Sequence, residues 1–111
     1  MIMDEITKKF LEDRRYFPLQ TRKLFSDTYN YGSHISTIFA GDTENYETAV
    51  LDIRYHNNYI IVEEYSNMED AKLGHEKWLK IMIENPPEFI LNKSTSKYDN
   101  IGYDVLFKLS N

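Results

Sequence analysis

The chain has 111 residues, with 13 Lys and Arg against 18 Asp and Glu, a formal net charge of −5 at pH 7 and no cysteine. This length is typical of one domain, so we expect residues 1–111 to form a single domain. The absence of cysteine excludes disulfides, iron–sulfur clusters, Cys-ligated zinc and a cysteine nucleophile. A pI near 5.1 disfavours direct binding to nucleic acid or to anionic lipid.

Neither export nor membrane insertion is indicated. The N-terminal residues include acids by position 5 and lack the apolar run of about 7–15 residues that a signal peptide requires. The uninterrupted apolar stretches, such as 59–62, are far shorter than the roughly 20 residues that span a bilayer. We therefore expect a cytoplasmic protein without a membrane segment.

The N-terminal part predicts helix followed by loop. Apolar residues recur at helical spacing over residues 3–15, with charged residues on the other face, so we expect an amphipathic helix there. Pro18 interrupts the pattern, and residues 19–25 favour one or two further helical turns. The polar, tyrosine-rich stretch 26–33 is typical of a loop.

The middle of the chain predicts three strands. Residues 34–40 suit a strand that ends at a Gly-Asp turn, and residues 46–55 alternate between an apolar and a mixed face. A short polar turn at 56–58 joins the second strand to a partner over 59–65, which predicts a hairpin. The expected apolar face of the second strand consists of Ala49, Leu51, Ile53 and Tyr55.

A long helix and a last strand follow. The Ser66–Glu69 spacing matches a capping box, and the helix should run from Met68 to about Ile83, where the sequence Asn-Pro-Pro stops it. Its expected buried stripe is Met68, Ala71, His75, Trp78, Leu79 and Met82. Residues 102–109 alternate as a final strand. The predicted fold is α+β, an antiparallel or mixed sheet of about four strands with a central hairpin, an N-terminal helix and one long helix before the last strand.

Catalytic and metal-binding signatures are lacking. No two histidines are spaced so that they would lie on one face of a helix and bind a metal together. The chain has three, His34, His56 and His75. No phosphate-binding loop or nucleophile motif is present, so we expect a protein that is not an enzyme and takes no cofactor. Gly74 is costly inside a helix. Either a neighbouring aromatic ring or the sheet approaches the helix there, or the gap admits a ligand beside His75 and Trp78.

The sequence concentrates acidic residues and tyrosines in one segment. Residues 41–76 carry nine acidic and two basic residues, a formal charge of −7, whereas both flanking parts are nearly neutral. Glu63 and Glu64 should point to opposite faces of a strand, so they do not suit acid–base catalysis. Either the acidic face is merely solvated, or it docks on a basic partner, including one whose groove holds nucleic acid. The candidate binding residues are Tyr46, Glu47, Asp52, Tyr59, Glu63, Glu64, Tyr65, Glu69 and Asp70.

Three short motifs resemble small uncharacterised proteins of bacteriophages and prophages. They are YETAV at 46–50, VEEY at 62–65 and EDAKLGHEKW at 69–78, and the resemblance covers residues 46–82. It implies a phage setting and no catalytic residue. We therefore expect a non-enzymatic accessory protein that binds and inhibits or modulates a host protein with a basic surface, such as an anti-phage defence protein. The alternative is a structural or assembly component of the phage particle, and a homo-oligomer stays open.

Overall fold

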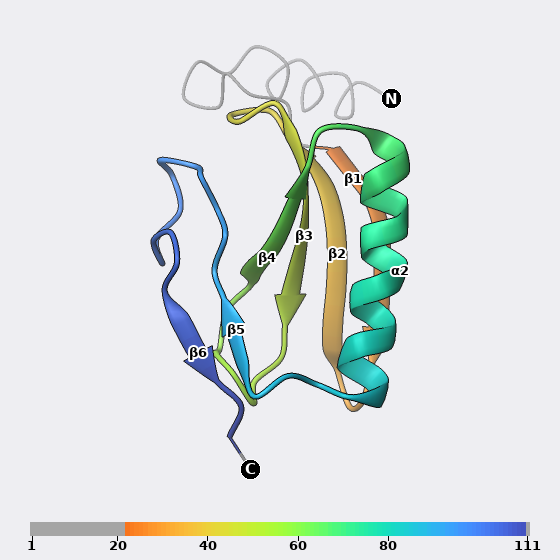
Figure 1. Cartoon of the computed structure of the whole chain (residues 1–111), viewed down its shortest axis with the longest axis vertical. Coiled ribbons are helices and arrows are strands. Elements are labelled where there is room, and N and C mark those ends of the chain that lie inside the picture. Colours follow the sequence, from red (N-terminus) through yellow and green to blue (C-terminus); the bar gives the residue numbers. More distant parts are fainter. Residues whose placement is uncertain (1–21, 111) are drawn as a thin grey trace, which may run out of the picture.

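One antiparallel sheet and one helix dominate the computed structural model, which describes residues 22–110 (Figure 1). The sheet has the strand order β1-β2-β3-β4, and the remaining two strands form a separate ribbon. The elements are β1 (Arg22–Tyr29), β2 (Ser33–Ala40), β3 (Asn45–Leu51), β4 (Ile60–Tyr65), α2 (Met68–Glu84), β5 (Phe89–Leu91) and β6 (Leu106–Lys108). The α+β class and the four-stranded sheet are confirmed. The helix predicted over residues 3–15 lies outside the described residues.

Strand β1 occupies a stretch for which the sequence predicts helical turns and a loop. Arg22–Tyr29 pairs antiparallel with β2, with a register shift between Lys23 and Phe25, so both predictions are wrong for these residues. The strand lies at the sheet edge and five of its eight residues are exposed, so its polar composition does not prevent pairing. Asn30, Tyr31 and Gly32 then turn the chain, each with a positive φ.

The strand over residues 34–40 and the central hairpin are confirmed, but one expected face is wrong. β3 and β4 pair antiparallel, with a register shift between Thr48 and Ala49. β3 ends at Leu51, and the connection to β4 is longer than the tight turn that we expected. The alternation therefore does not continue through Ile53, which is 82% exposed, whereas Val50, expected on the mixed face, is fully buried.

Helix α2 agrees with the prediction at both ends to within about a residue. Its N-cap is Asn67, whose side chain accepts a hydrogen bond of 2.8 Å from the backbone N–H of Asp70. The predicted Ser66–Glu69 capping box is therefore replaced by an asparagine cap. Met68, expected in the buried stripe, is exposed. The buried positions of α2 are Ala71, Gly74, His75 and Met82.

The last strand belongs to the ribbon and not to the main sheet. β6 spans only Leu106–Lys108 and pairs with β5, a strand the sequence pattern does not predict. Gly102 and Asp104 both have positive φ, so the chain cannot stay extended through residues 102–109 as expected. The fourth strand of the main sheet is β1 instead.

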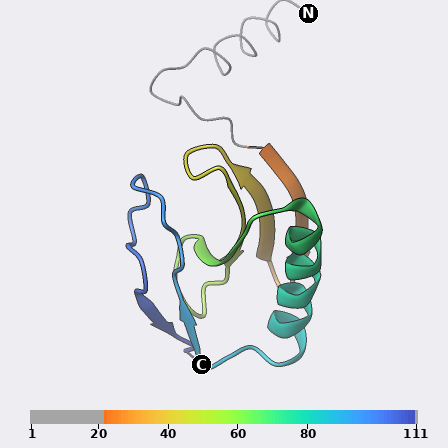
Figure 2. The same ribbon diagram turned by 45° about the horizontal axis from the view of Figure 1, so that its top comes forward.

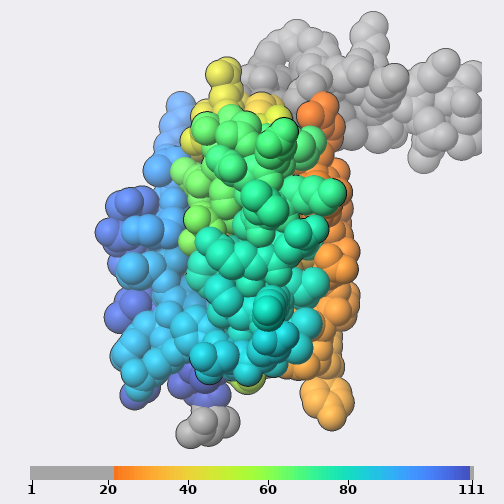
Figure 3. Space-filling view, turned by 45° about the vertical axis from the view of Figure 1, so that its right-hand side comes forward, coloured from red at the N-terminus to blue at the C-terminus, as the bar shows by residue number. Residues whose placement is uncertain are grey.

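The helix and the ribbon lie at different sides of the sheet. α2 runs along one face, and the ribbon lies on the β4 side (Figures 1 and 2). Seen from the helix side, α2 lies between β1 and the segment that leads to β5 (Figure 3). The buried apolar cluster consists of Tyr29, Ile35, Val50, Tyr55, Ile60, Val62, Met82 and Ile90. Near the middle of α2, the contact between helix and sheet includes a buried polar pair, His75 and Thr37. Within residues 22–110, no helix combines the length and apolar character needed to cross a bilayer.

Candidate functional site

Acidic residues gather at the end of the sheet where α2 begins. The 41–44 turn, the end of β4 and the start of α2 are neighbours there, because Tyr46 pairs with Tyr65 in the sheet register (Figures 1 and 3). These parts and the facing end of β3 carry six of the nine acidic residues of segment 41–76, namely Asp42, Glu44, Glu47, Glu64, Glu69 and Asp70, with Glu47 on β3. We call these six residues the acidic end. Charge that is spread along the sequence is thus brought together by the fold.

The nine candidate binding residues do not form one exposed surface. Tyr59, Glu69 and Asp70 are exposed, and Tyr46, Glu63 and Glu64 are half-buried. Glu47 and Asp52 are only 6% and 2% exposed, so they present almost no surface to a partner in this conformation, and Tyr65, 9% exposed, reaches solvent only where it lines a hollow beside α2. Asp52 and Tyr59 also lie at the opposite end of the β3–β4 hairpin from the acidic end. The assignment of Glu47 and Asp52 to a docking surface is therefore corrected.

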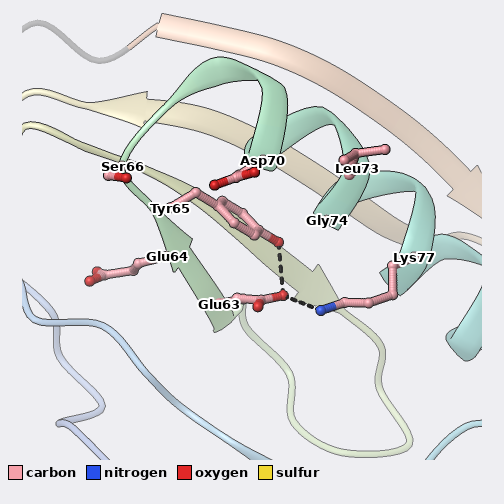
Figure 4. A pocket seen from close by; sticks show the side chains of 8 residues that line it. All are labelled: Glu63, Glu64, Tyr65, Ser66, Asp70, Leu73, Gly74 and Lys77. Atoms are coloured by element: carbon pink, nitrogen blue, oxygen red, sulfur yellow. Dashed lines mark hydrogen bonds and ion pairs between the residues drawn. The ribbon is translucent and has the colours of Figure 1, made fainter.

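A hollow of about 420 Å³ lies between β4 and α2 (Figure 4). Its lining is Glu63, Glu64, Tyr65, Ser66, Asp70, Leu73, Gly74 and Lys77, so it includes four of the candidate residues. Figure 4 shows Glu63 directed toward Lys77 and Glu64 directed away from it, as expected for neighbours on a strand. The hollow presents more acidic than basic side chains.

Glu63 accepts hydrogen bonds from three different side chains. Its Oε1 accepts from Lys77 Nζ at 2.6 Å, from Trp78 Nε1 at 2.8 Å and from the Tyr65 hydroxyl at 3.1 Å. Burial alone would raise the pKa of Glu63, but the bonds from Lys77 and Trp78 outweigh it and hold the pKa below its usual range. Glu63 is thus ionised at neutral pH and already paired, so a basic ligand must compete with Lys77.

Glu64 and Glu47 are directly opposite each other in the β3–β4 pair. Glu64 accepts hydrogen bonds from the backbone N–H and hydroxyl of Thr95, whereas Glu47 is buried and its Oε2 has no donor within the part of the chain that the structure describes. Burial, reinforced by the negative charges of Glu64 and Asp42, raises the pKa of Glu47 to about 8. Glu47 is therefore mostly protonated at neutral pH, and the acidic end carries less charge than its sequence implies.

An acid–imidazole–hydroxyl arrangement lies on the other flank of α2. His75 Nε2 is 2.7 Å from Asp27 Oδ2, and His75 Nδ1 is 2.7 Å from Thr37 Oγ1. The geometry resembles that of an activated nucleophile, but Thr37 is fully buried and no substrate reaches its hydroxyl in this conformation. Asp27 escapes sequence-based detection because its strand is predicted as a loop. Alternation of Phe25, Asp27 and Tyr29 with smaller residues is the signal that could have revealed it.

The costly glycine of α2 has a packing explanation. A Cβ added to Gly74 would overlap the ring and hydroxyl of Tyr65, so the aromatic side chain fills the space beside the helix. Of the two explanations left open by the sequence, close approach of a neighbouring aromatic ring is the one observed. Glycine at position 74 therefore serves to bring α2 and β4 together.

The histidines do not converge on a metal site. His34 lies on β2, His56 in the β3–β4 connection and His75 on α2. Across residues 22–110, no group of three or more potential metal-binding side chains is close enough to hold an ion.

Comparison of the chain with models of protein families, with curated proteins and with solved structures finds no match.

Proposed function

We propose that this chain acts by binding, and that its acidic end docks on a basic surface of a partner protein. The observation that carries the proposal is the convergence of the 41–44 turn, the end of β4 and the start of α2 at one end of the sheet. Glu44, Glu69 and Asp70 are exposed there and free to meet basic side chains as the partner approaches. Opposite charges across an interface speed association and select the partner.

The proposed setting is bacteriophage infection of a bacterial cell. It is supported by the resemblance of segment 46–82 to phage and prophage proteins, a segment that includes the hollow and most of the acidic end. In this setting the chain would be an accessory protein that inhibits or modulates a host protein in the cytoplasm. A host defence protein with a basic groove is the first partner to test.

Charge reversal at two exposed positions tests the docking surface. Glu44→Lys with Glu69→Lys changes the charge of the acidic end by four units without altering any side-chain hydrogen bond of the described residues. We expect a host protein captured from a bacterial lysate by the wild-type chain to be lost with this variant. Binding should also weaken as salt rises, because exposed charges are screened.

The matched control places the same charge change elsewhere. Glu84→Lys with Glu88→Lys alters exposed residues near the end of α2, away from the acidic end. This control should retain the captured protein at wild-type yield. Retention by the acidic-end variant, or equal loss from both variants, would contradict docking through the acidic end.

Exposed apolar residues on the ribbon favour a second candidate function, that of a phage-particle component that associates with copies of itself. Phe89, Leu91 and Leu106 are exposed on one face of the ribbon, while Ile90 of the same ribbon is buried. Adjacent exposed apolar residues often mark a surface where proteins associate. Light scattering separates the phage-particle component from the binding protein. A ring or filament that the Leu106→Ser substitution disperses favours the phage-particle component. A monomer or dimer favours the binding protein.

A further inference from the structure

A continuous line of polar contacts crosses the interface between α2 and the sheet. It starts at Asp27 on β1 and ends at Glu63 on β4, and it passes under the helix through side chains of β2 and β3. The successive contacts are Asp27 Oδ2 to His75 Nε2 at 2.7 Å, His75 Nδ1 to Thr37 Oγ1 at 2.7 Å, Thr37 Oγ1 to Thr48 Oγ1 at 2.7 Å, Thr48 Oγ1 to the Tyr65 hydroxyl at 3.0 Å, and that hydroxyl to Glu63 Oε1 at 3.1 Å. We call this line the polar chain.

The interior of the polar chain is closed to solvent, and its ends are open. Thr37 and Thr48 are fully buried, and His75 is 4% exposed. Asp27 and His75 border a hollow of about 360 Å³ on one flank of α2, and Glu63 borders the hollow of about 420 Å³ on the other flank. Each contact of the two buried threonines must therefore find its hydrogen within the polar chain, because buried polar atoms are costly when unpaired.

The protonation state of His75 decides whether the hydrogens suffice. A carboxylate only accepts, so His75 Nε2 carries a hydrogen for Asp27 in either state. Four contacts then remain between His75 Nδ1 and Glu63. Neutral His75 leaves three hydrogens for them, one from each hydroxyl of Thr37, Thr48 and Tyr65, so one contact has none. Protonated His75 adds the hydrogen of Nδ1, and all four contacts are filled.

When His75 is neutral, the contact without a hydrogen is the one between the Tyr65 hydroxyl and Glu63. The contacts of Thr37 with His75 and with Thr48 are both 2.7 Å, a distance that requires a hydrogen between the two atoms. The Tyr65 hydroxyl lies 3.0 Å from Thr48 and 3.1 Å from Glu63, so its single hydrogen can serve either one. With His75 neutral, the threonine hydroxyls donate toward His75, and Tyr65 donates to Thr48.

We infer that the polar chain is a proton-controlled link between the two flanks of α2. Protonation of His75 reverses the direction in which the hydroxyls of Thr37 and Thr48 donate their hydrogen bonds. The Tyr65 hydroxyl, which donates to Thr48 when His75 is neutral, then donates to Glu63. Among residues 22–110, the charged groups around His75 are Asp27 from β1 and Lys72 and Glu76 from α2, while β2 and β3 contribute the hydroxyls of Thr37 and Thr48. At the other end, Lys77 faces Glu63 from α2. Linkage is reciprocal, so a ligand that changes the Tyr65–Glu63 bond also changes the proton affinity of His75.

The single tryptophan of the chain reports on this link. Trp78 Nε1 donates to the same Glu63 oxygen that receives the Tyr65 hydroxyl, so the nuclear magnetic resonance signal of its indole N–H senses whether Tyr65 donates there. Glu63 stays ionised between pH 5 and 8, the range in which histidines change charge, because its pKa is lowered. We expect the Trp78 signal of the wild-type chain to shift with the same midpoint as the ring signals of His75.

Thr48→Val removes the central hydroxyl and nearly preserves the shape of the side chain. His75 should then titrate with a midpoint at lower pH, because the hydrogen of Thr37 has no acceptor once Nδ1 is protonated. The Trp78 signal should no longer follow His75. Thr43→Val is the matched control, since Thr43 lies outside the polar chain and its buried Oγ1 has no hydrogen-bond partner among the described residues. This control should keep the wild-type behaviour of both signals.

Two results would overturn the link. One is a Trp78 signal of the wild-type chain that stays constant while His75 titrates. The other is a Trp78 signal that follows the protonation of His75 in Thr48→Val as it does in the wild type. In that case the charge of His75 would act on Trp78 directly through space and not through the polar chain. If Thr48→Val does not fold, Tyr65→Phe provides the second variant, because it also leaves a buried threonine hydrogen unpaired when His75 is protonated. An unchanged His75 midpoint in Tyr65→Phe contradicts the link as well.

Discussion

The ring of Tyr65 occupies the space that a side chain at position 74 of α2 would fill. This contact lets the helix approach β4 closely and places the Tyr65 hydroxyl within reach of both Thr48 and Glu63. Glycine inside a helix costs about 1 kcal/mol relative to alanine. That cost is offset here by packing of the helix on an aromatic ring, and the same contact helps to build the polar chain.

Gly74→Ala should therefore destabilise the protein, although alanine favours helix formation. The added methyl group must displace the Tyr65 ring, and overpacking of this kind typically costs about 1–3 kcal/mol. Urea denaturation followed by the fluorescence of Trp78 measures the change in the free energy of unfolding. The hydrogen bond from Tyr65 to Thr48 should weaken in the same variant, because the ring moves.

A double-mutant cycle supplies the control. In a Tyr65→Ala background the space beside position 74 is empty, so Gly74→Ala should become neutral or stabilising there, as helix propensity alone predicts. Equal effects of Gly74→Ala in both backgrounds would show that Tyr65 is not the reason for the glycine.

Glu47 should make the protein less stable at alkaline pH. Its pKa in the folded chain is about 8 because of burial and the charges of Glu64 and Asp42, against 4.5 when unperturbed. A raised pKa contributes stability that is fully present below pH 4.5 and is lost as the pH rises through about 8. Chemical denaturation between pH 5.5 and 8 should show a fall in the free energy of unfolding of up to about 1.4 kcal/mol per pH unit from this residue.

Glu47→Gln should flatten that pH dependence, because an amide stays neutral at every pH in the range. Glu88→Gln, a substitution of an exposed glutamate, is the matched control and should leave the slope as in the wild type. A wild-type slope that Glu47→Gln does not reduce would show that Glu47 is not the protonated group.

The elements predicted correctly have strong local signals. β2, the β3–β4 hairpin and α2 combine a clear period with turn or breaker residues at their ends, and Asn-Pro-Pro ends the helix where expected. β1 has only a weak signal, the alternation of Phe25, Asp27 and Tyr29 with smaller residues. It is an edge strand with an exposed polar face, and its polar sequence resembles a loop until its pairing with β2 is known.

The candidate site is only partly predictable, because sequence position does not determine burial. The acidic segment gathers at one end of the sheet, yet Glu47 and Asp52 point inward while Glu69 and Asp70 are exposed. The polar chain could not be derived from the sequence. It joins residues from four strands and one helix, and its first member, Asp27, belongs to the strand that local patterns do not indicate.

Asp52 stabilises the end of the hairpin opposite to the acidic end. It is 2% exposed and accepts hydrogen bonds from the Tyr29 hydroxyl at 2.7 Å and from Arg54 Nη2 at 2.7 Å. Burial by itself would raise the pKa of Asp52, but the bonds from Arg54 and Tyr29 outweigh burial and lower it. The carboxylate is therefore ionised at neutral pH and joins β1 to the β3–β4 connection.

Replacing Asp52 should cost stability in proportion to the bonds lost. Asp52→Ala leaves the buried Tyr29 hydroxyl and Arg54 without their acceptor, and we expect a loss of about 3 kcal/mol at pH 7. Asp52→Asn keeps an acceptor for Tyr29 and should lose less. Because the pKa is lowered, the contribution of the carboxylate is present above pH 3.8 and is lost as the pH falls below that value. Urea denaturation at pH 7 and pH 3 should show the gap between wild type and Asp52→Asn shrinking at the lower pH, and a gap that stays constant would contradict the role of the ionised carboxylate.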